Sequence, residues 1–359
     1  MKAKSLLPQV SGWLARYGTL VMLVVPLVII AAAGDLFGTI LIKQIVTILF
    51  IDLTLVVGLQ IFMGNSGILT FAHIGFMGIG AYASALFSMT PEAKIINNPD
   101  LYPILVPIHL PFLPSILLGA TVAALIALVV SFPLMRLSDA AAVITSFALL
   151  GIIHAVLAHW SQVTSGPKTL FGVDPYTTLW TSVAWGIFFV LLAFWLKESS
   201  LGLKIRASRD DRYAASTIGI NIVMVRWAAF ILSAFVAALG GGLWAHFITS
   251  FAPPNFYLTE TFVILAMLVI GGPGSVSGAV VGTLVVTAVF EGLRGIENAV
   301  NLSQTLPFLL VGFTEVFLAV VMILILVFRP AGIMQGQEIR WPGRQARPEA
   351  AQGPTDQTS

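Results

Sequence analysis

Apolar runs separated by short polar stretches repeat along most of the sequence. An α-helix needs about 20 mostly apolar residues to cross a membrane, and ten runs approach that length. They cover residues 17–34, 40–62, 66–89, 112–135, 140–160, 179–196, 226–249, 259–271, 275–293 and 305–328. The pattern predicts an all-α, polytopic membrane protein with about ten transmembrane or re-entrant helices, whose membrane domain covers residues 17–328.

Two of the ten runs differ from the others. The third contains Gly67, Gly75, Gly78 and Gly80, whereas the eighth is short and ends in the sequence GGPG at 271–274. A backbone that leaves helical geometry at membrane depth must be buried in protein or must line a cavity. We therefore expect both segments to be broken or packed against neighbouring helices.

The basic residues set the direction of these crossings, because Lys and Arg gather in cytoplasmic loops. With a cytoplasmic N-terminus and ten crossings, fourteen of the 18 basic residues fall inside, and only four fall outside or at the outer boundary: Lys43, Lys94, Lys168 and Arg294. Both termini are therefore predicted to be cytoplasmic. Residues 1–16 form the cytoplasmic N-terminal segment, and residues 329–359 are expected to form a disordered cytoplasmic tail, which from Arg340 is rich in Pro, Gln and small polar residues.

Composition excludes several classes of protein. The chain is 58% hydrophobic and 9% charged, with a net charge of +2 and no cysteine, so a water-soluble fold, a nucleic-acid-binding surface and a thiolate metal site are excluded. The apolar N-terminal run is longer than a signal-peptide core, which favours a retained membrane anchor. The sequence has no nucleotide-binding P-loop, no histidine spacing typical of a metal site and no nucleophile elbow. We expect no cofactor, no bound metal and no catalytic residue.

The loop at 197–225 stands out because it carries six of the basic residues, counting Arg226 at its edge. Such a loop is either an orientation signal or a docking element for a soluble partner. Ser208 and Asp211 fit a capping box, which predicts a short helix beginning at Arg209. Gly219 can end that helix in a left-handed cap. A capped helix at the membrane surface favours docking.

Three motifs resemble the LivM-type permease subunits of branched-chain amino acid ABC importers, and the resemblance covers most of residues 40–328. They are GNSGILTFAHIGFMGIGAY at 64–82, GLKIRASRDDRYAASTIGIN at 202–221 and GGPGSVSGAVVGT at 271–283. The loop residues expected to couple to an ATPase are Gly202, Arg206, Arg209, Asp210, Asp211, Ala214, Ala215 and Gly219. The residues expected in the translocation pathway or in helix packing are Asn65, Ser66, Gly67, Gly78, Gly80, Tyr82, Gly271, Gly272, Pro273, Gly274 and Ser275.

The middle of the chain departs from the pattern of these permeases. Asp139 stands where they usually have glycine, Ala141 where they have an aromatic residue, and Gly151 where they have an acidic one. These differences bear on the solute more than on the fold.

The resemblance implies a permease subunit of an ABC importer in a bacterial inner membrane. It would work with a LivH-like second permease, two cytoplasmic ATPase subunits and a periplasmic binding protein. Branched-chain or related amino acids are the expected solutes, and urea or a small carboxylate is the alternative. A self-contained secondary carrier is the rival from another class. Few ionisable residues lie within the runs, which argues against such a carrier, and the sequence leaves the roles of Asp52 and Glu315 open.

The predicted topology can be tested with fused reporters. A reporter that is active only in the cytoplasm should be active after Arg347 and inactive near Lys168, because the ten-span arrangement places these residues on opposite sides. The reverse pattern at either site would contradict that arrangement.

Overall fold

The computed structural model describes residues 7–303, 312–329 and 331–339. The regular structure in these ranges is helical, apart from one isolated β-bridge between Leu170 and Phe251. The helices in chain order are α1 (Leu7–Phe37), α2 (Ile40–Leu59), the π-helix η1 (Gln60–Gly64), α3 (His73–Ser88), α4 (Pro91–Asn97), α5 (Phe112–Leu134), α6 (Asp139–His159), α7 (Ser161–Thr164), α8 (Leu179–Glu198), α9 (Ser200–Asp210), α10 (Arg212–Thr217), α11 (Ile222–Ile248), the 3-10 helix η2 (Pro253–Phe256), α12 (Leu258–Gly271), α13 (Val276–Ser303) and α14 (Phe313–Phe328).

Eight helical segments of the described chain are long and apolar enough to cross a membrane. They match eight of the ten predicted spans and confirm the all-α polytopic class. The other two predicted spans contain the shorter helices α3 and α14, each of 16 residues. At about 1.5 Å per residue, a helix of that length spans less than the bilayer core of about 30 Å. The first part of the last predicted span, 305–311, lies outside the described residues.

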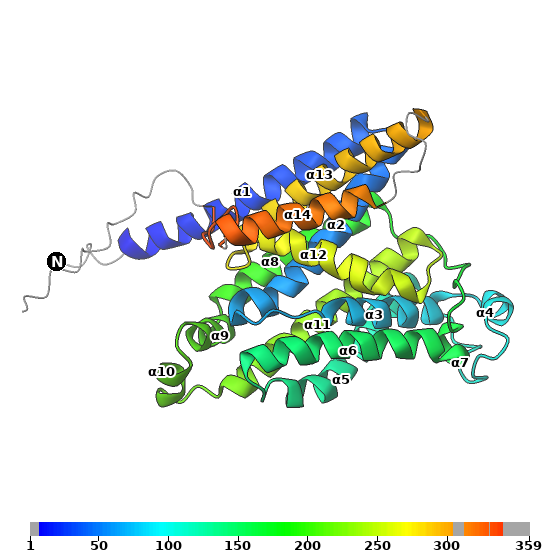
Figure 1. Ribbon diagram of the computed structural model, residues 1–359, viewed down its shortest axis with the longest axis horizontal. Helices are drawn as coiled ribbons and strands as arrows, with labels where there is room; N and C mark the ends of the chain where they lie inside the picture. The colour runs from blue at the N-terminus through cyan, green and yellow to red at the C-terminus, as the bar shows by residue number, and fades with distance from the viewer. Residues whose placement is uncertain (1–6, 304–311, 330, 340–359) are drawn as a thin grey trace, which may run out of the picture.

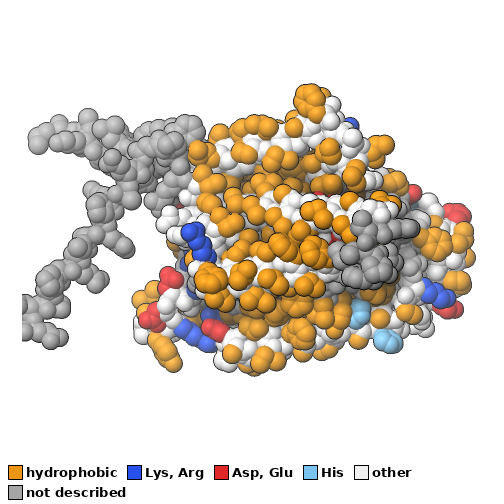
Figure 2. All heavy atoms as spheres, turned by 45° about the horizontal axis from the view of Figure 1, so that its top comes forward, with side chains coloured by type: hydrophobic (Ala, Val, Ile, Leu, Met, Phe, Trp, Pro, Cys, Tyr) orange, Lys and Arg blue, Asp and Glu red, His pale blue; other side chains and the backbone are white. Residues whose placement is uncertain are grey.

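The long helices run roughly side by side, and the short helices gather at the two ends (Figure 1). α9 and α10 lie at one end, and α4 and α7 lie at the other. Apolar side chains cover most of the surface between the ends, and many of the charged side chains in view sit toward the ends (Figure 2). This distribution is what a bilayer requires, because hydrocarbon contacts the middle of the molecule and water contacts the ends.

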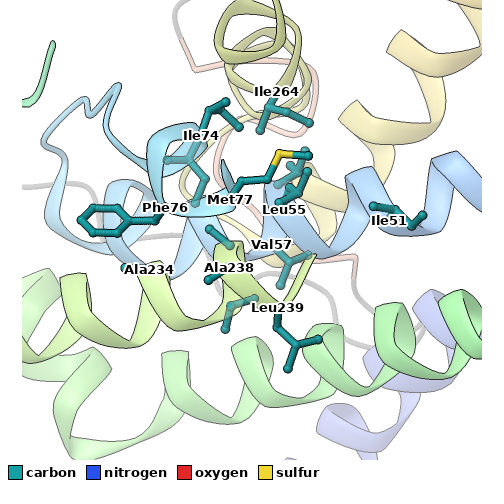
Figure 3. Close-up of a cluster of buried hydrophobic side chains, with 14 of the residues drawn as sticks. Ile51, Leu55, Val57, Ile74, Phe76, Met77, Ala234, Ala238, Leu239 and Ile264 are labelled. Carbon is teal, nitrogen blue, oxygen red and sulfur yellow. The ribbon is translucent and has the colours of Figure 1, made fainter. Parts of the chain in front are cut away.

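The core of the bundle is built around α11, which packs most extensively on α3 and α5. Figure 3 shows buried side chains from α2, α3, α11 and α12 meeting there, including Leu55, Met77, Ala238 and Ile264. The contact is close because glycines remove the side chains between the helices. A Cβ on Gly80 would lie 2.1 Å from the carbonyl oxygen of Ala238.

α5 packs on α3 beside the place where α3 contacts α11. A Cβ on Gly119 of α5 would lie 2.9 Å from the carbonyl oxygen of Gly80 and 2.9 Å from the amide nitrogen of Ser84. Without a strong hydrophobic driving force between helices in lipid, such small residues allow the van der Waals contact that holds a bundle together. Gly80 therefore lies where α3 comes closest to α5 and α11.

The packing can be tested at Gly241, where an added Cβ would lie 2.0 Å from the carbonyl oxygen of Met77. Gly241→Ala should lower the free energy of unfolding by about 1–3 kcal/mol, because the α3 and α11 backbones must separate. Gly151→Ala is the matched control, since a Cβ at Gly151 has no neighbouring atom within 4 Å. Thermal unfolding of both variants in detergent measures the effect, and equal melting temperatures would contradict the close contact.

Candidate functional site

The three sequence motifs meet at the end of the bundle that carries α9. The Nη1 atom of Arg209 donates a hydrogen bond to the carbonyl oxygen of Gly64, at 2.8 Å. Gly64 in turn lies against the second glycine motif, because a Cβ on it would fall 2.2 Å from the carbonyl oxygen of Pro273. The predicted coupling loop and two separate breaks in the helices therefore form one site.

The first break follows α2. The helix widens into the π-helix Gln60–Gly64, and the chain leaves helical geometry after Ser66. The side chain of Asn65 donates to the carbonyl oxygen of Ile61 at 2.9 Å. Ser66 Oγ accepts from the amide of Ile68 at 3.2 Å. Gly67 adopts a φ of 73°, and a Cβ there would lie 3.0 Å from the Arg209 side chain.

The second break separates α12 from α13. α12 ends at Gly271, and Gly272 has a φ of 111°, a conformation that L-residues with a Cβ rarely adopt. Ser275 Oγ accepts from the amide of Gly278 at 3.0 Å, so it caps the start of α13. The predicted break in this segment is confirmed.

Residues 331–339, here called the C-terminal strap, pack across the second break. The amides of Ile333 and Met334 donate to the carbonyl oxygens of Ile270 and Gly271, at 2.9 and 3.0 Å. The expectation of a disordered tail from residue 329 is wrong for these residues, because they form hydrogen bonds with α12 and α13. The polar composition that indicated disorder begins only at Arg340, and residues 340–359 lie outside the described part of the chain.

Glu338 of the strap bonds to the start of α13. Its carboxylate accepts from the amides of Val276 and Ser277, both at 2.9 Å, and from the Ser277 hydroxyl at 2.5 Å. Lys197 Nζ donates to Glu338 at 2.6 Å and to the carbonyl oxygen of Gly274 at 2.9 Å. Burial alone would raise the pKa of Glu338, but the charge of Lys197 and the hydrogen bonds outweigh it and hold that pKa below its usual 4.5.

Sequence reasoning missed Lys197 and Glu338 as site residues. Lys197 follows an apolar run, where a lysine is ordinary. Glu338 is separated from Ser277 by 61 residues, so no local spacing relates the two. The one sequence feature that could have indicated the site was Glu338 itself, an acidic residue just before the polar tail that begins at Arg340.

The loop contains two helices instead of the single helix expected from Arg209. Ser199 Oγ accepts from the amide of Gly202 and caps α9, while Asp211 accepts from the amides of Tyr213 and Ala214 and caps α10. The predicted capping role of Ser208 is wrong, because its hydroxyl donates to the Ile205 carbonyl inside α9. α9 begins before Arg209 because Gly202, Ile205 and Ser208 pack against the bundle. Their burial stabilises helical turns that the local sequence did not predict.

Gly219 ends α10 as predicted, with a φ of 83°. The amides of Ile220 and Gly219 donate to the carbonyl oxygens of Ala215 and Ser216, which is the hydrogen-bond pattern of a Schellman cap. Ala215 is buried against the bundle, whereas Ala214 is exposed. The short helix therefore has one face on the protein and one face toward solvent.

The remaining predicted residues do not join this site. Asp210 is exposed at the last position of α9. Gly78 and Tyr82 lie further along α3, where a Cβ on Gly78 would fall 2.8 Å from Leu157. Tyr82 is 2% exposed and packs on the aromatic ring of Phe256. The first motif therefore divides into a break near the coupling loop and a packing segment away from it.

Asp139, one of the departures from the expected pattern, has a structural partner. Its carboxylate accepts from Arg226 Nη1 at 2.8 Å, and Arg212 Nη1 lies 3.8 Å away. Arg226 is 1% exposed, so a counter-charge is needed there. This pair ties the start of α6 to the start of α11, beside α10.

Comparison with known proteins gives the site its context. The model of the branched-chain amino acid transport system permease component family matches residues 41–327. The chain belongs to this family. It is 24% identical to the high-affinity branched-chain amino acid permease LivM of Salmonella typhimurium, over 97% of this chain and 82% of LivM.

Two further relatives share parts of the permease. The nucleoside ABC transporter permease NupC of Lactococcus lactis is 24% identical over 59% of this chain and 69% of NupC. The branched-chain amino acid permease LivH of Escherichia coli is 28% identical over 45% of this chain and 49% of LivH. No solved structure matches the chain. The resemblance to LivM-type permeases is confirmed, and the chain is a multi-pass membrane subunit of the ABC permease type.

Proposed function

We propose that this permease is the membrane subunit of an importer that moves branched-chain or related amino acids across a bacterial inner membrane. ATP hydrolysis would take place on two partner subunits in the cytoplasm, where both termini of this chain would also lie. A LivH-like permease would complete the pathway, and a periplasmic binding protein would deliver the solute. Family membership supports the general mechanism, and the geometry of α9 and α10 supports the coupling step.

The observation that carries the proposal is the two-sided structure of the loop. α9 packs one face on the bundle, with Arg209 bonded to the first helix break and Gly202 against the end of α8. α10 instead presents Tyr213 and Ile218 to solvent, at 85% and 74% exposure. Large apolar side chains so exposed on a charged loop favour burial in a partner. The loop can therefore bind an ATPase on one side and contact the helix breaks on the other.

The proposed solute rests on the match to LivM and on the apolar interior. LivM is named as a branched-chain amino acid permease and NupC as a nucleoside permease, so membership of the family does not by itself identify the solute. The match to LivM extends over more of the chain than the match to NupC. An apolar interior also suits a zwitterion, whose net charge is zero, better than an ion.

Reconstitution of the permease with its partner subunits in liposomes tests the proposal. Uptake of labelled leucine should require ATP and the binding protein, and excess isoleucine or valine should compete where a nucleoside or urea does not. Uptake by the permease alone, without ATP, would identify a secondary carrier instead. Competition by the nucleoside or urea would keep the ABC mechanism and replace the solute.

The docking face of α10 gives a separate prediction. Changing Tyr213 and Ile218 together to serine should reduce co-purification of the ATPase by at least about tenfold, because two anchors buried at an interface commonly carry more than about 1.4 kcal/mol. Leu302→Ser is the matched control, since Leu302 is 85% exposed but lies on α13. Undiminished co-purification by the α10 variant would leave the loop as an orientation signal.

A further inference from the structure

Lys197 belongs to two sets of contacts at once. Its backbone is held by α9, because Arg206 Nη2 donates to the Lys197 carbonyl oxygen at 2.9 Å. Gly202 packs so closely there that a Cβ would lie 2.6 Å from the same oxygen. A shift of α9 must therefore move the end of α8 with it, since backbone packed this tightly cannot slide independently.

The side chain of Lys197 reaches the opposite way, into the break between α12 and α13. The ammonium group bonds to Gly274 O and to Glu338, and the Lys197 and Glu338 side chains are only 6% and 18% exposed. Charges this deeply buried depend on each other, because either one alone would be desolvated without a partner. The pair therefore fixes the end of α8 to the second break.

The C-terminal strap extends this connection to both ends of the break. Every helix leaves its last carbonyls and first amides without partners in the helix. Here the strap supplies them: Ile333 and Met334 donate to the end of α12, and Glu338 accepts from the start of α13. The strap holds the two helix ends at a fixed spacing, and Lys197 joins that unit to α9.

We propose that Lys197 and Glu338 are positioning residues for energy coupling, which form a latch between α9 and the α12–α13 break. This inference rests on the proposed function, since it names the contacts through which force on the loop would reach the membrane helices. Arg209 contacts the first break, and the latch is the matching contact to the second. A purely structural pair would hold the fold together without affecting how much solute moves for each ATP hydrolysed.

The test compares three permease variants in the complete reconstituted transporter: Lys197→Met, Glu338→Gln and the double variant. Each single change should lower the amount of solute transported per ATP by at least about threefold. The double variant should be no worse than the more severe single one, because both residues act through one contact. Lys43→Met is the control, since it removes the exposed 2.9 Å pair with Asp35 between α1 and α2 and leaves the hydrogen bond from Trp180 to Asp35 in place. Its transport per ATP should equal that of wild type.

Several outcomes would overturn the latch. Unchanged transport per ATP in both single variants would make the pair structural, and additive losses in the double variant would make the two residues independent. Loss of the ATPase from the purified complex would place their role in docking. A wild-type complex that transports without ATP would instead contradict the proposed function.

Hydrogen–deuterium exchange tests the latch without transport. The amides of Ile333 and Met334 should exchange slowly in the wild-type permease, because they are bonded across the break, and faster in Glu338→Gln. The amides of α10 should exchange at the same rate in both proteins. Equal protection of the strap in the two proteins would show that Glu338 does not hold it.

Discussion

Backbone groups in an apolar environment must form hydrogen bonds, and the arrangement of this permease depends on how it meets that constraint at two interrupted helices. Intact helices satisfy the requirement internally. At Gly64–Gly67 and Gly271–Ser275 the helices are interrupted, and hydrogen-bond partners come both from neighbouring side chains and from remote segments. Arg209 serves the first break, and Lys197 and the C-terminal strap serve the second. Arg209 on α9 and Lys197 at the end of α8 also connect the two breaks to the loop.

The rest of the bundle is rigid by comparison, because glycines bring whole backbones into contact. α3 and α11 approach so closely that there is no room for a Cβ at Gly80 or Gly241, and α5 approaches α3 as closely at Gly119. Packing of this kind resists displacement. A force applied at α9 therefore has a stiff support in α11 and two connections to interrupted helices, whose ends are held by a small number of polar contacts. This division favours motion at the breaks and not in the core.

Two buried basic side chains near the loop each have an acidic partner. Of the groups near the loop, Arg226 is matched by Asp139 and Lys197 by Glu338. The exposed charges of α9 and α10 surround the apolar side chains Tyr213 and Ile218. In both pairs the basic side chain is buried, so any arrangement that removes its acidic partner is penalised. The pairs specify which helix ends stay together, as the proposed coupling requires.

The sequence alone determined the membrane class, eight of the spans and the position of the second break; for the first it indicated only that residues 66–89 are broken or closely packed, and Gly75, Gly78 and Gly80 lie inside the continuous helix α3. These features depend on local properties: the length of an apolar run, and the conformations that glycine and proline allow. It also placed the end of α10, because Gly219 is the residue that tolerates the left-handed cap. Only the tertiary structure decided that α9 begins at Ser200, that residues 331–339 fold back, and that Lys197 meets Glu338. Those outcomes depend on burial and on hydrogen bonds between residues far apart in the chain, and no local pattern of residues encodes such contacts.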